Sequence, residues 1–314
     1  MKKKGWLLVC LYAFNLCNAN TLVYNLKIRR AFDIPEGLFT QTRPLWIASA
    51  VPIIYQRDRH ILVPELFTDI HETRLTTGAL LNLRYKPSRH WWFEASTGIE
   101  KERACAVGTT NLHLSRTGFD DFLFSGGYIG FPQENTQVVA YGLFGIPSKW
   151  EIGAQERILT DTLVGTRFFS IGTGLESSHA FMNELENSLV GVFQARFIHF
   201  FSRSLRPSVA CGNFLHPGNV IDALFLVQYR QKMTLFEAGY NPTFFTNQAV
   251  TASCVKTETP NFVRQGATFS CTHLFKDMLF DRMPLIIGTG VNFSHSKRFD
   301  TKILSAWLNF TTVF

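Results

Sequence analysis

The chain has 314 residues, of which 31 are Lys or Arg and 24 are Asp or Glu, giving a formal net charge of +7 at pH 7. Phe accounts for 30 residues and aromatic residues for 14%, although the mean hydropathy is only +0.04. The basic excess is small and scattered, which argues against a nucleic-acid-binding protein. A soluble core of this size does not need so much Phe. A membrane β-barrel does, because its apolar surface faces lipid while polar residues fill its interior.

Residues 1–19 have the features of a secretory signal peptide. Three lysines at positions 2–4 precede an apolar run over residues 6–16, and Ala19 supplies a small residue before the expected cleavage site. A lipoprotein signal is the alternative interpretation, and it is disfavoured because bulky residues directly precede both cysteines of this segment. The sequence therefore predicts export.

The exported part divides into a short first segment and one large domain. Residues 20–43 mix apolar patches with Lys and Arg, and they fit a periplasmic arm better than a plug or an irregular first strand. Residues 44–314 are predicted to form the domain. No run of about 18 apolar residues follows residue 19, so no transmembrane helix is expected. An exported, aromatic-rich chain without such a helix crosses a membrane only as a closed barrel.

From residue 44 onward the sequence breaks into runs with period-two alternation, separated by segments rich in Gly, Pro, Asn and Asp. The predicted strands are Leu45–Tyr55, Thr73–Tyr85, Arg89–Glu100, Phe119–Phe131, Thr136–Ile146, Thr162–Leu175, Ser188–Phe200, Asn219–Arg230, Thr234–Phe245, Phe262–His273, Pro284–Ser294 and Lys302–Phe314. Bacterial barrels have even strand numbers, so this pattern predicts about 12 strands, with 10 or 14 as alternatives. The predicted fold is all-β, a transmembrane antiparallel up-and-down barrel.

The gaps between these strands alternate in length. The long gaps are residues 56–72, 101–118, 147–161, 201–218 and 246–261, and the gaps between them are mostly short. Outer-membrane barrels have long loops on the outside and short turns in the periplasm, so we expect the long gaps to form outer loops.

The last stretch, Lys302–Phe314, has one nearly apolar face that includes Leu304, Leu308 and Phe310. It resembles the terminal strand of Gram-negative outer-membrane β-barrels, which ends in an aromatic residue with apolar residues at alternate positions. The resemblance implies a location in the outer membrane, in contact with its lipid. It also implies that Phe310 and Phe314 form an assembly signal read by the barrel assembly machinery. A buried edge strand of a soluble β-sandwich is the alternative interpretation of this stretch.

Strand parity predicts which side chains face the interior of the barrel. A charge on the lipid face near the centre of the bilayer costs up to ~2–4 kcal/mol, so charged strand residues are expected to point inward. The predicted lining residues are Asn82, Arg84, Glu94, Glu100, Gln194, Arg196, Asp222, Gln228, Arg230 and Glu237. They form either a mixed-charge solute path or a paired network that closes the lumen, and the sequence leaves both alternatives open.

An enzymatic function has little support in the sequence. The outer-membrane phospholipase A family carries a His-x-Ser-Asn-Gly motif, and the nearest match, starting at His113 and Ser115, lacks the Asn and Gly. It also falls in a predicted loop. Protease activity at the barrel rim, as in the omptin family, would need paired acidic residues and a His–Asp couple. Only Asp120-Asp121 and His71-Glu72 offer such residue types, and nothing else in the sequence supports that function. We therefore predict no catalytic residues.

Metal, cofactor and disulfide signals are weak. The histidines are scattered without ligand spacing, and no Gly-rich phosphate loop or C-x-x-C pair occurs, so no metal site or cofactor is predicted. Export permits disulfides among Cys105, Cys211, Cys254 and Cys271, with three pairings open.

The sequence thus predicts an outer-membrane barrel that acts as a passive channel or small-solute transporter with a mixed-charge lumen. The alternative is a closed structural barrel that acts through its outer loops, and a lipase-type enzyme is the third.

Overall fold

The computed structural model describes residues 44–63, 68–107, 112–133, 135–148, 168–183, 187–206, 213–252, 255–258, 260–279, 283–297 and 300–313. In these ranges the strands are β1 (Leu45–Val63), β2 (Thr68–Lys86), β3 (Trp91–Val107), β4 (Leu112–Phe119), β5 (Phe122–Gln133), β6 (Thr136–Ile146), β7 (Ser170–Asn183), β8 (Asn187–Phe200), β9 (Arg203–Arg206), β10 (Asn213–His216), β11 (Asn219–Gln231), β12 (Thr234–Tyr240), β13 (Thr243–Thr246), β14 (Ala249–Ala252), β15 (Val255–Glu258), β16 (Phe262–Leu279), β17 (Met283–Ser296) and β18 (Thr301–Val313). No helix within these ranges is long and apolar enough to span a membrane. The predicted all-β class is confirmed.

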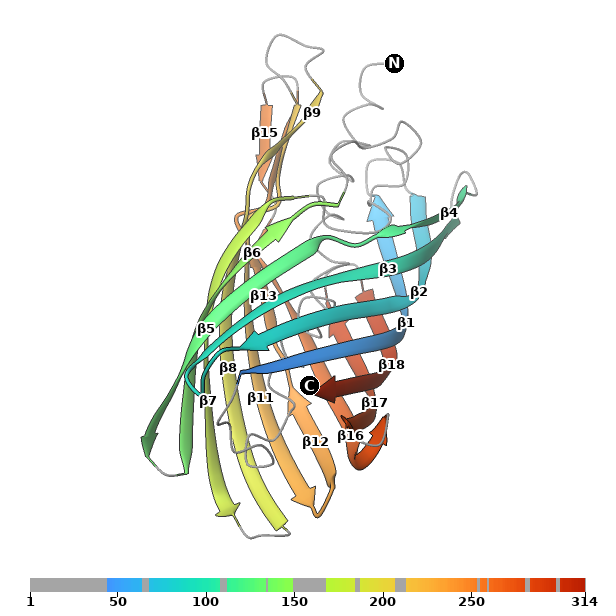
Figure 1. The fold of residues 1–314 in the computed structure, drawn as a ribbon. Helices are drawn as coiled ribbons and strands as arrows, with labels where there is room; N and C mark the ends of the chain where they lie inside the picture. The colour runs from blue at the N-terminus through green and yellow to red at the C-terminus, as the bar shows by residue number, and fades with distance from the viewer. Residues whose placement is uncertain are drawn as a thin grey trace.

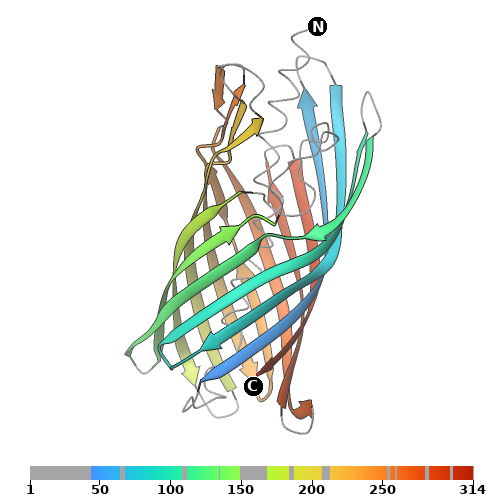
Figure 2. The same ribbon diagram turned by 45° about the horizontal axis from the view of Figure 1, so that its top comes forward.

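Fourteen of these segments form one antiparallel sheet that closes into a barrel of twelve strands (Figures 1 and 2). Two of the twelve are interrupted. Segments β4 and β5 both pair with β3, on either side of Asp120 and Asp121. Segments β12 and β13 both lie between β11 and β16, on either side of Asn241 and Pro242. Pro lacks the N–H that a continuous ladder needs, which explains the second break. The predicted strand count is confirmed.

The barrel closes where its first strand meets its last. Strand β1 pairs with β18 in an antiparallel register that runs from Ile47 opposite Val313 to Asp58 opposite Lys302. Strand β8 pairs directly with β11, so the ring of neighbours is complete on the other side as well. Closure leaves the barrel itself without an unpaired sheet edge, which is the condition for a sheet to cross a bilayer.

The distribution of side chains is inverted relative to a soluble protein. Along β18, Leu304, Leu308 and Phe310 are exposed outward by 56%, 47% and 39%, whereas Ser305 and Asn309 are buried inside. The other strands repeat this pattern, with exposed Phe, Leu, Ile and Val on the outer surface and buried charged residues in the interior. An apolar outer surface around a charged interior is the arrangement of a barrel that spans lipid.

One predicted strand has the wrong position. The sequence predicts a strand over Thr162–Leu175, of which residues 162–167 lie outside the described residues, whereas β7 is Ser170–Asn183 and takes in residues 176–183 of the predicted turn. The error comes from treating the polar run after Leu175 as a turn. Inside a barrel polar residues remain in the strand, and Glu176 is indeed buried.

Four of the predicted outer loops, 56–72, 101–118, 201–218 and 246–261, are wrong, because their described residues are largely extended β-structure. The predicted loop 147–161 lies outside the described residues from residue 149 onward. The β1–β2 ladder continues to the pair Val63–Thr68, and β3 continues to Val107 opposite β4. Strands β9, β10, β14 and β15 form a separate four-stranded sheet, in the order β15-β14-β10-β9. In Figure 1 this sheet projects beyond one end of the barrel, as a continuation of β8, β11, β13 and β16. We call this end of the barrel the extended end.

Large aromatic side chains inside the barrel pack over glycines on the neighbouring strand. Gly290 lies opposite Trp307 in the β17–β18 ladder, and a Cβ atom on Gly290 would lie 2.3 Å from the Trp307 ring and 2.8 Å from the carbonyl oxygen of Phe269. Since one of these neighbours is backbone, the added atom has no free space. The glycine is required here by the close approach of the ring.

Replacing Gly290 by Ala is therefore expected to lower the free energy of unfolding by about 1–3 kcal/mol, the usual cost of overpacking. Urea titration of tryptophan fluorescence in lipid vesicles measures it. The matched control is Gly142→Ala, where the nearest atom to a new Cβ is 3.9 Å away. Equal effects of the two substitutions would contradict the packing argument.

Candidate functional site

The ten residues predicted from strand alternation to face the interior do lie on the inner surface of the barrel. Asn82, Arg84, Glu94, Glu100, Gln194, Arg196, Asp222 and Glu237 are buried, and Gln228 and Arg230 are half-buried. Their neighbours along the strands point the other way: Leu83 is exposed by 44% and Phe93 by 53%. The predicted residues thus lie on the inner face, at several depths and on several strands.

Two of the charged residues form a cross-strand pair between β2 and β3. Arg84 lies opposite Glu94 in the ladder and donates to its Oε2 atom from Nε at 3.2 Å and from a terminal guanidinium nitrogen at 3.0 Å. The guanidinium carbon of Arg84 also lies 4.8 Å from the ring centroid of Trp92. The pair contributes one charge of each sign, so it is neutral as a unit.

A second pair of the same kind joins β8 and β11. Arg196 lies opposite Asp222 and donates from Nε to Oδ2 at 3.1 Å, with a second hydrogen bond to the same oxygen. Nearby, the Gln194 amide donates to the Tyr141 hydroxyl at 3.0 Å. Both side chains of the ion pair are almost completely buried.

The third group lies between β11, β12 and β16. The Gln228 amide donates to Glu237 at 2.7 Å, and the Ser270 hydroxyl donates to the other carboxylate oxygen of Glu237. Asn82 donates to the Ser49 hydroxyl at 3.1 Å. The structure therefore distributes the predicted residues over separate groups and does not gather them into one site.

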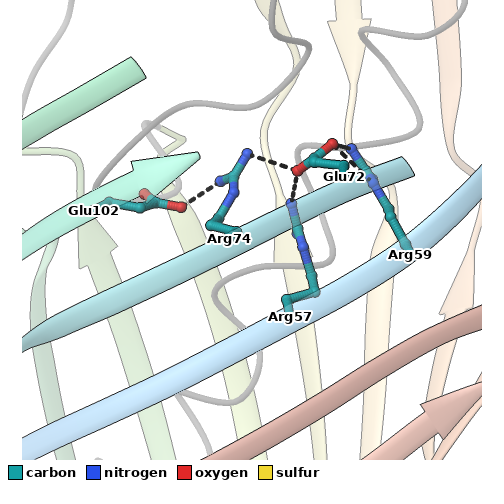
Figure 3. A network of polar contacts seen from close by, with 5 residues as sticks. All are labelled: Arg57, Arg59, Glu72, Arg74 and Glu102. Atoms are coloured by element: carbon teal, nitrogen blue, oxygen red, sulfur yellow. Dashed lines mark hydrogen bonds and ion pairs between the residues drawn. The ribbon is translucent and has the colours of Figure 1, made fainter. Parts of the chain in front are cut away.

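Sequence reasoning missed a group of five charged residues in the described interior. Three arginines surround one carboxylate near the extended end, and a second carboxylate adjoins them (Figure 3). Its members are Arg57, Arg59, Glu72, Arg74 and Glu102, and we call them the Glu72 network. Most of them fall in the predicted loops 56–72 and 101–118. The signal that could have found them is parity, because Arg57 and Arg59 continue the inward series of Val51, Ile53 and Tyr55.

Both oxygens of Glu72 are engaged. Arg57 donates to Oε1 at 2.8 Å and Arg74 to the same oxygen at 3.3 Å. Arg59 donates to Oε2 from Nε at 3.0 Å and from a terminal nitrogen. Arg74 extends the network to Glu102 through an ion pair of 2.5 Å. All five side chains are exposed by 5% or less, so the charges interact in a largely water-excluded setting.

The outward side chains around the Glu72 network are of mixed character. Leu75, next to Arg74, lies half-buried on the outer face, and Val107, opposite His71, is exposed by 50%. His60, Lys101 and Lys302 on the same outer face are polar or charged. The network itself lies on the parts of β1, β2 and β3 that lead to the extended end (Figure 1).

Buried apolar side chains also line the interior, which parity did not predict. The larger cluster lies on β3, β5, β6, β8, β11 and β13 and at Phe168 just before β7, and its members are Trp92, Leu123, Ile129, Val139, Tyr141, Leu143, Phe168, Ile198, Phe200, Val220 and Phe245. A smaller cluster lies on β1, β2 and β18. Charged pairs lie on the same strands, such as Arg196–Asp222 on β8 and β11, so charged and apolar side chains are interspersed on the inner face. Because the apolar side chains pack against one another, the interior is not a wide aqueous pore.

The remaining candidates for chemistry stay dispersed. Ser115 lies on β4, so its predicted loop position is wrong. Among the described residues, no group of three or more His, Cys, Asp and Glu side chains is placed to hold a metal ion. Cys105 and Cys271 are free thiols, whereas Cys211 and Cys254 lie outside the described residues. So do residues 1–43, with the predicted signal peptide and arm, and Phe314 of the predicted assembly signal.

Comparison with known proteins identifies the fold. No protein-family model matches the sequence, and no curated protein matches it. Among solved structures, the chain is similar to an outer-membrane channel from Pseudomonas putida F1, with 11% identity, a TM-score of 0.55 and coverage of 85% of this chain and 96% of that chain. It is also similar to the transport unit of the autotransporter AIDA-I from Escherichia coli, with 10% identity, a TM-score of 0.53 and coverage of 96% and 97%. With its closed twelve-stranded sheet and its apolar outer surface, the chain has the fold of the outer-membrane β-barrels to which it is similar.

Proposed function

We propose that the protein is a narrow outer-membrane channel for small solutes, with a lumen lined by charges of both signs. The observation that carries this proposal is the series of ion pairs on the inner wall, from Arg84–Glu94 and Arg196–Asp222 to the Glu72 network. A barrel that only needs to be filled can use apolar side chains, as the clusters around Tyr141 and Trp307 do. Burying charges is costly, so charged pairs on several strands of the inner face support a path for polar solutes.

The fold likeness to the Pseudomonas putida channel supports the same function by analogy of architecture. The packed apolar clusters limit the width of the path. We therefore expect small conductance steps or a channel that opens intermittently. Partners on this proposal are outer-membrane lipid, small solutes and the barrel assembly machinery, which would read the outward face of β18 that includes Phe310.

Single-channel recording of the purified protein in a planar bilayer tests the proposal. Steady steps that scale with salt concentration are expected. Arg84→Gln should shift the reversal potential toward cation preference and Glu94→Gln toward anion preference, because each removes one charge from the lumen. Lys256→Gln, on the exposed outer sheet, is the control and should leave selectivity unchanged. Silence from protein with heat-modifiable gel migration would overturn the channel.

The second candidate is a closed barrel that acts through its outer sheet. The observation in its favour is the four-stranded extension, whose end strands β9 and β15 each pair on one side only among the described strands. Ser202 and His216 are hydrogen-bonded at its base at 2.6 Å, and burial together with the nearby Lys256 charge lowers the pKa of His216. This candidate predicts no conductance from correctly folded protein, so the same recording separates the two.

A further inference from the structure

The outer surface of the barrel carries the same arrangement of three side chains twice. In each, a Thr is the first residue of a strand, a His lies directly opposite it on the neighbouring strand, and a Phe follows that His by two residues. The two sets are Thr136, His179 and Phe181 on β6 and β7, and Thr234, His273 and Phe275 on β12 and β16. Strands β6 and β12 both begin at the end of the barrel opposite the extended end (Figure 1). We call these sets the two histidine triads.

Each imidazole ring is held by two contacts. Thr136 Oγ1 lies 2.9 Å from Nδ1 of His179, and Thr234 Oγ1 lies 2.8 Å from Nδ1 of His273. The Phe ring packs edge-on against the imidazole, with ring centroids 5.1 Å apart in the first triad and 4.5 Å apart in the second. Within the part of the chain that the structure describes, Nε2 of neither ring has a hydrogen-bond partner. Both rings are thus fixed in orientation with one nitrogen left over.

The triads continue the apolar outer surface toward the short turns. Leu175 and Phe269, four residues before the two histidines on the same outward faces, are exposed by 48% and 57%. Four residues of a strand span about 13 Å, and Phe181 beyond His179 is exposed by 70%, as an aromatic residue of an interfacial girdle is. Lipid headgroups adjoin side chains at this level of a membrane barrel.

The hydrogen bond at Nδ1 decides what the second nitrogen can do. When the Thr hydroxyl donates to Nδ1, the proton of a neutral imidazole is on Nε2, and Nε2 becomes a donor that needs an acceptor oxygen. A third turn of the same end presents a further donor, because the exposed Arg89 has its guanidinium carbon 4.1 Å from the ring centroid of Phe131. Phosphate oxygens suit both kinds of donor.

We propose that the two histidine triads bind the phosphate group of membrane phospholipids, with Nε2 of His179 and of His273 donating to phosphate oxygens. The neighbouring Phe of each triad contacts the lipid next to that headgroup. Strands β8 and β11 separate the two triads, so the bound phosphates fix the depth of the barrel at two points of its circumference. This inference concerns the lipid around the barrel, and it holds whether or not the lumen conducts.

Solid-state NMR of the protein in phosphatidylglycerol vesicles, in a phosphate-free buffer, tests the proposal. The dipolar coupling between isotopically labelled histidine nitrogens and lipid phosphorus is measured, and His179→Gln and His273→Gln assign the signals. Coupling is expected at Nε2 of both rings. Thr136→Val keeps His179 but removes the hydroxyl that orients it, so the coupling at His179 should be lost while that at His273 remains. Thr136→Ser keeps the hydroxyl and should retain both.

His295 is the matched control, because it also lies on the outer face but its Nε2 already lies 3.1 Å from Oδ1 of Asp300. No coupling between histidine and phosphorus at either triad, or coupling of the same size at His295, would overturn the proposal. Loss at His179 in both Thr136→Val and Thr136→Ser would do the same.

A second measurement separates lipid from free phosphate. In a detergent without phosphate groups, added phosphatidylglycerol should shift the Nε2 resonances of His179 and His273, whereas inorganic phosphate at the same concentration should not. Equal shifts with inorganic phosphate would assign the triads to free anions and overturn the lipid site.

Discussion

Replacing Leu308 by Arg is expected to lower the free energy of unfolding in lipid by about 2–4 kcal/mol, the cost of a cation on the lipid face near the middle of the bilayer. Leu308 lies at the middle of the outward face of β18 and is exposed by 47%. Since β18 also pairs with β1 to close the barrel, the variant should assemble less efficiently. Urea titration in vesicles gives the free energy, and heat-modifiable gel migration gives the folded fraction.

The control for this experiment is the same substitution at a position farther from the middle of the bilayer. Leu304→Arg changes the same face of the same strand, but the position lies next to the charged end with Lys302 and Asp300. The cost there should fall to about 0–1 kcal/mol, because the side chain reaches the interface. A larger penalty at Leu304 than at Leu308 would contradict the membrane placement derived from the apolar band.

The second large effect concerns the buried pair on the inner wall. Asp222→Asn is expected to destabilise the barrel by about 3–5 kcal/mol, because it removes the charge of the buried carboxylate to which the Arg196 guanidinium donates two hydrogen bonds. Arg264, which interacts electrostatically with Asp222, loses the same counter-charge. The free energy of unfolding of the variant in vesicles measures the effect.

Two controls separate charge pairing from the loss of any polar group. The double variant Arg196→Met with Asp222→Leu removes both charges of the pair, so its stability should recover in part, the remaining loss coming from Arg264, which still lacks the Asp222 charge. Glu258→Gln breaks the exposed pair with Lys256 on the outer sheet and should cause no measurable change. If the double variant is as unstable as Asp222→Asn, the buried pair is not the source of the effect.

The strand boundaries follow from sequence where turn residues enclose a run of strand-forming residues. Thr136–Ile146 has the bounds of β6, because it lies between the Pro132–Asn135 segment and Pro147. The same reasoning fails at β7 and at the extended end, where polar residues belong to strands. In a soluble protein a run of polar residues indicates an exposed loop, because the core is apolar. The interior of this barrel is partly charged, so a polar run can belong to a strand.

The inward orientation of the charged residues could be predicted from the sequence, but their pairing could not. Parity correctly places Arg84, Glu94 and Arg196 on the inner face, because their strand neighbours are apolar and face lipid. It gives no signal for the apolar inner cluster around Tyr141, where both faces of a strand are apolar. Parity also does not predict which inward side chains form ion pairs with one another. The convergence of three arginines on Glu72 depends on the register between β1 and β2, which parity leaves open.

The seam between β1 and β18 also sets the order of events during folding. Neighbouring strands elsewhere in the ring come from adjacent parts of the sequence, whereas this ladder joins residues from opposite ends of the described chain. Its formation must wait for the last strand, and the entropy of closing so long a loop makes it slow. Until then the sheet is open, with two long unpaired edges that could recruit strands from other chains. A longer lifetime of that open sheet is therefore expected to lower the yield of folded protein, whatever the stability of the closed barrel.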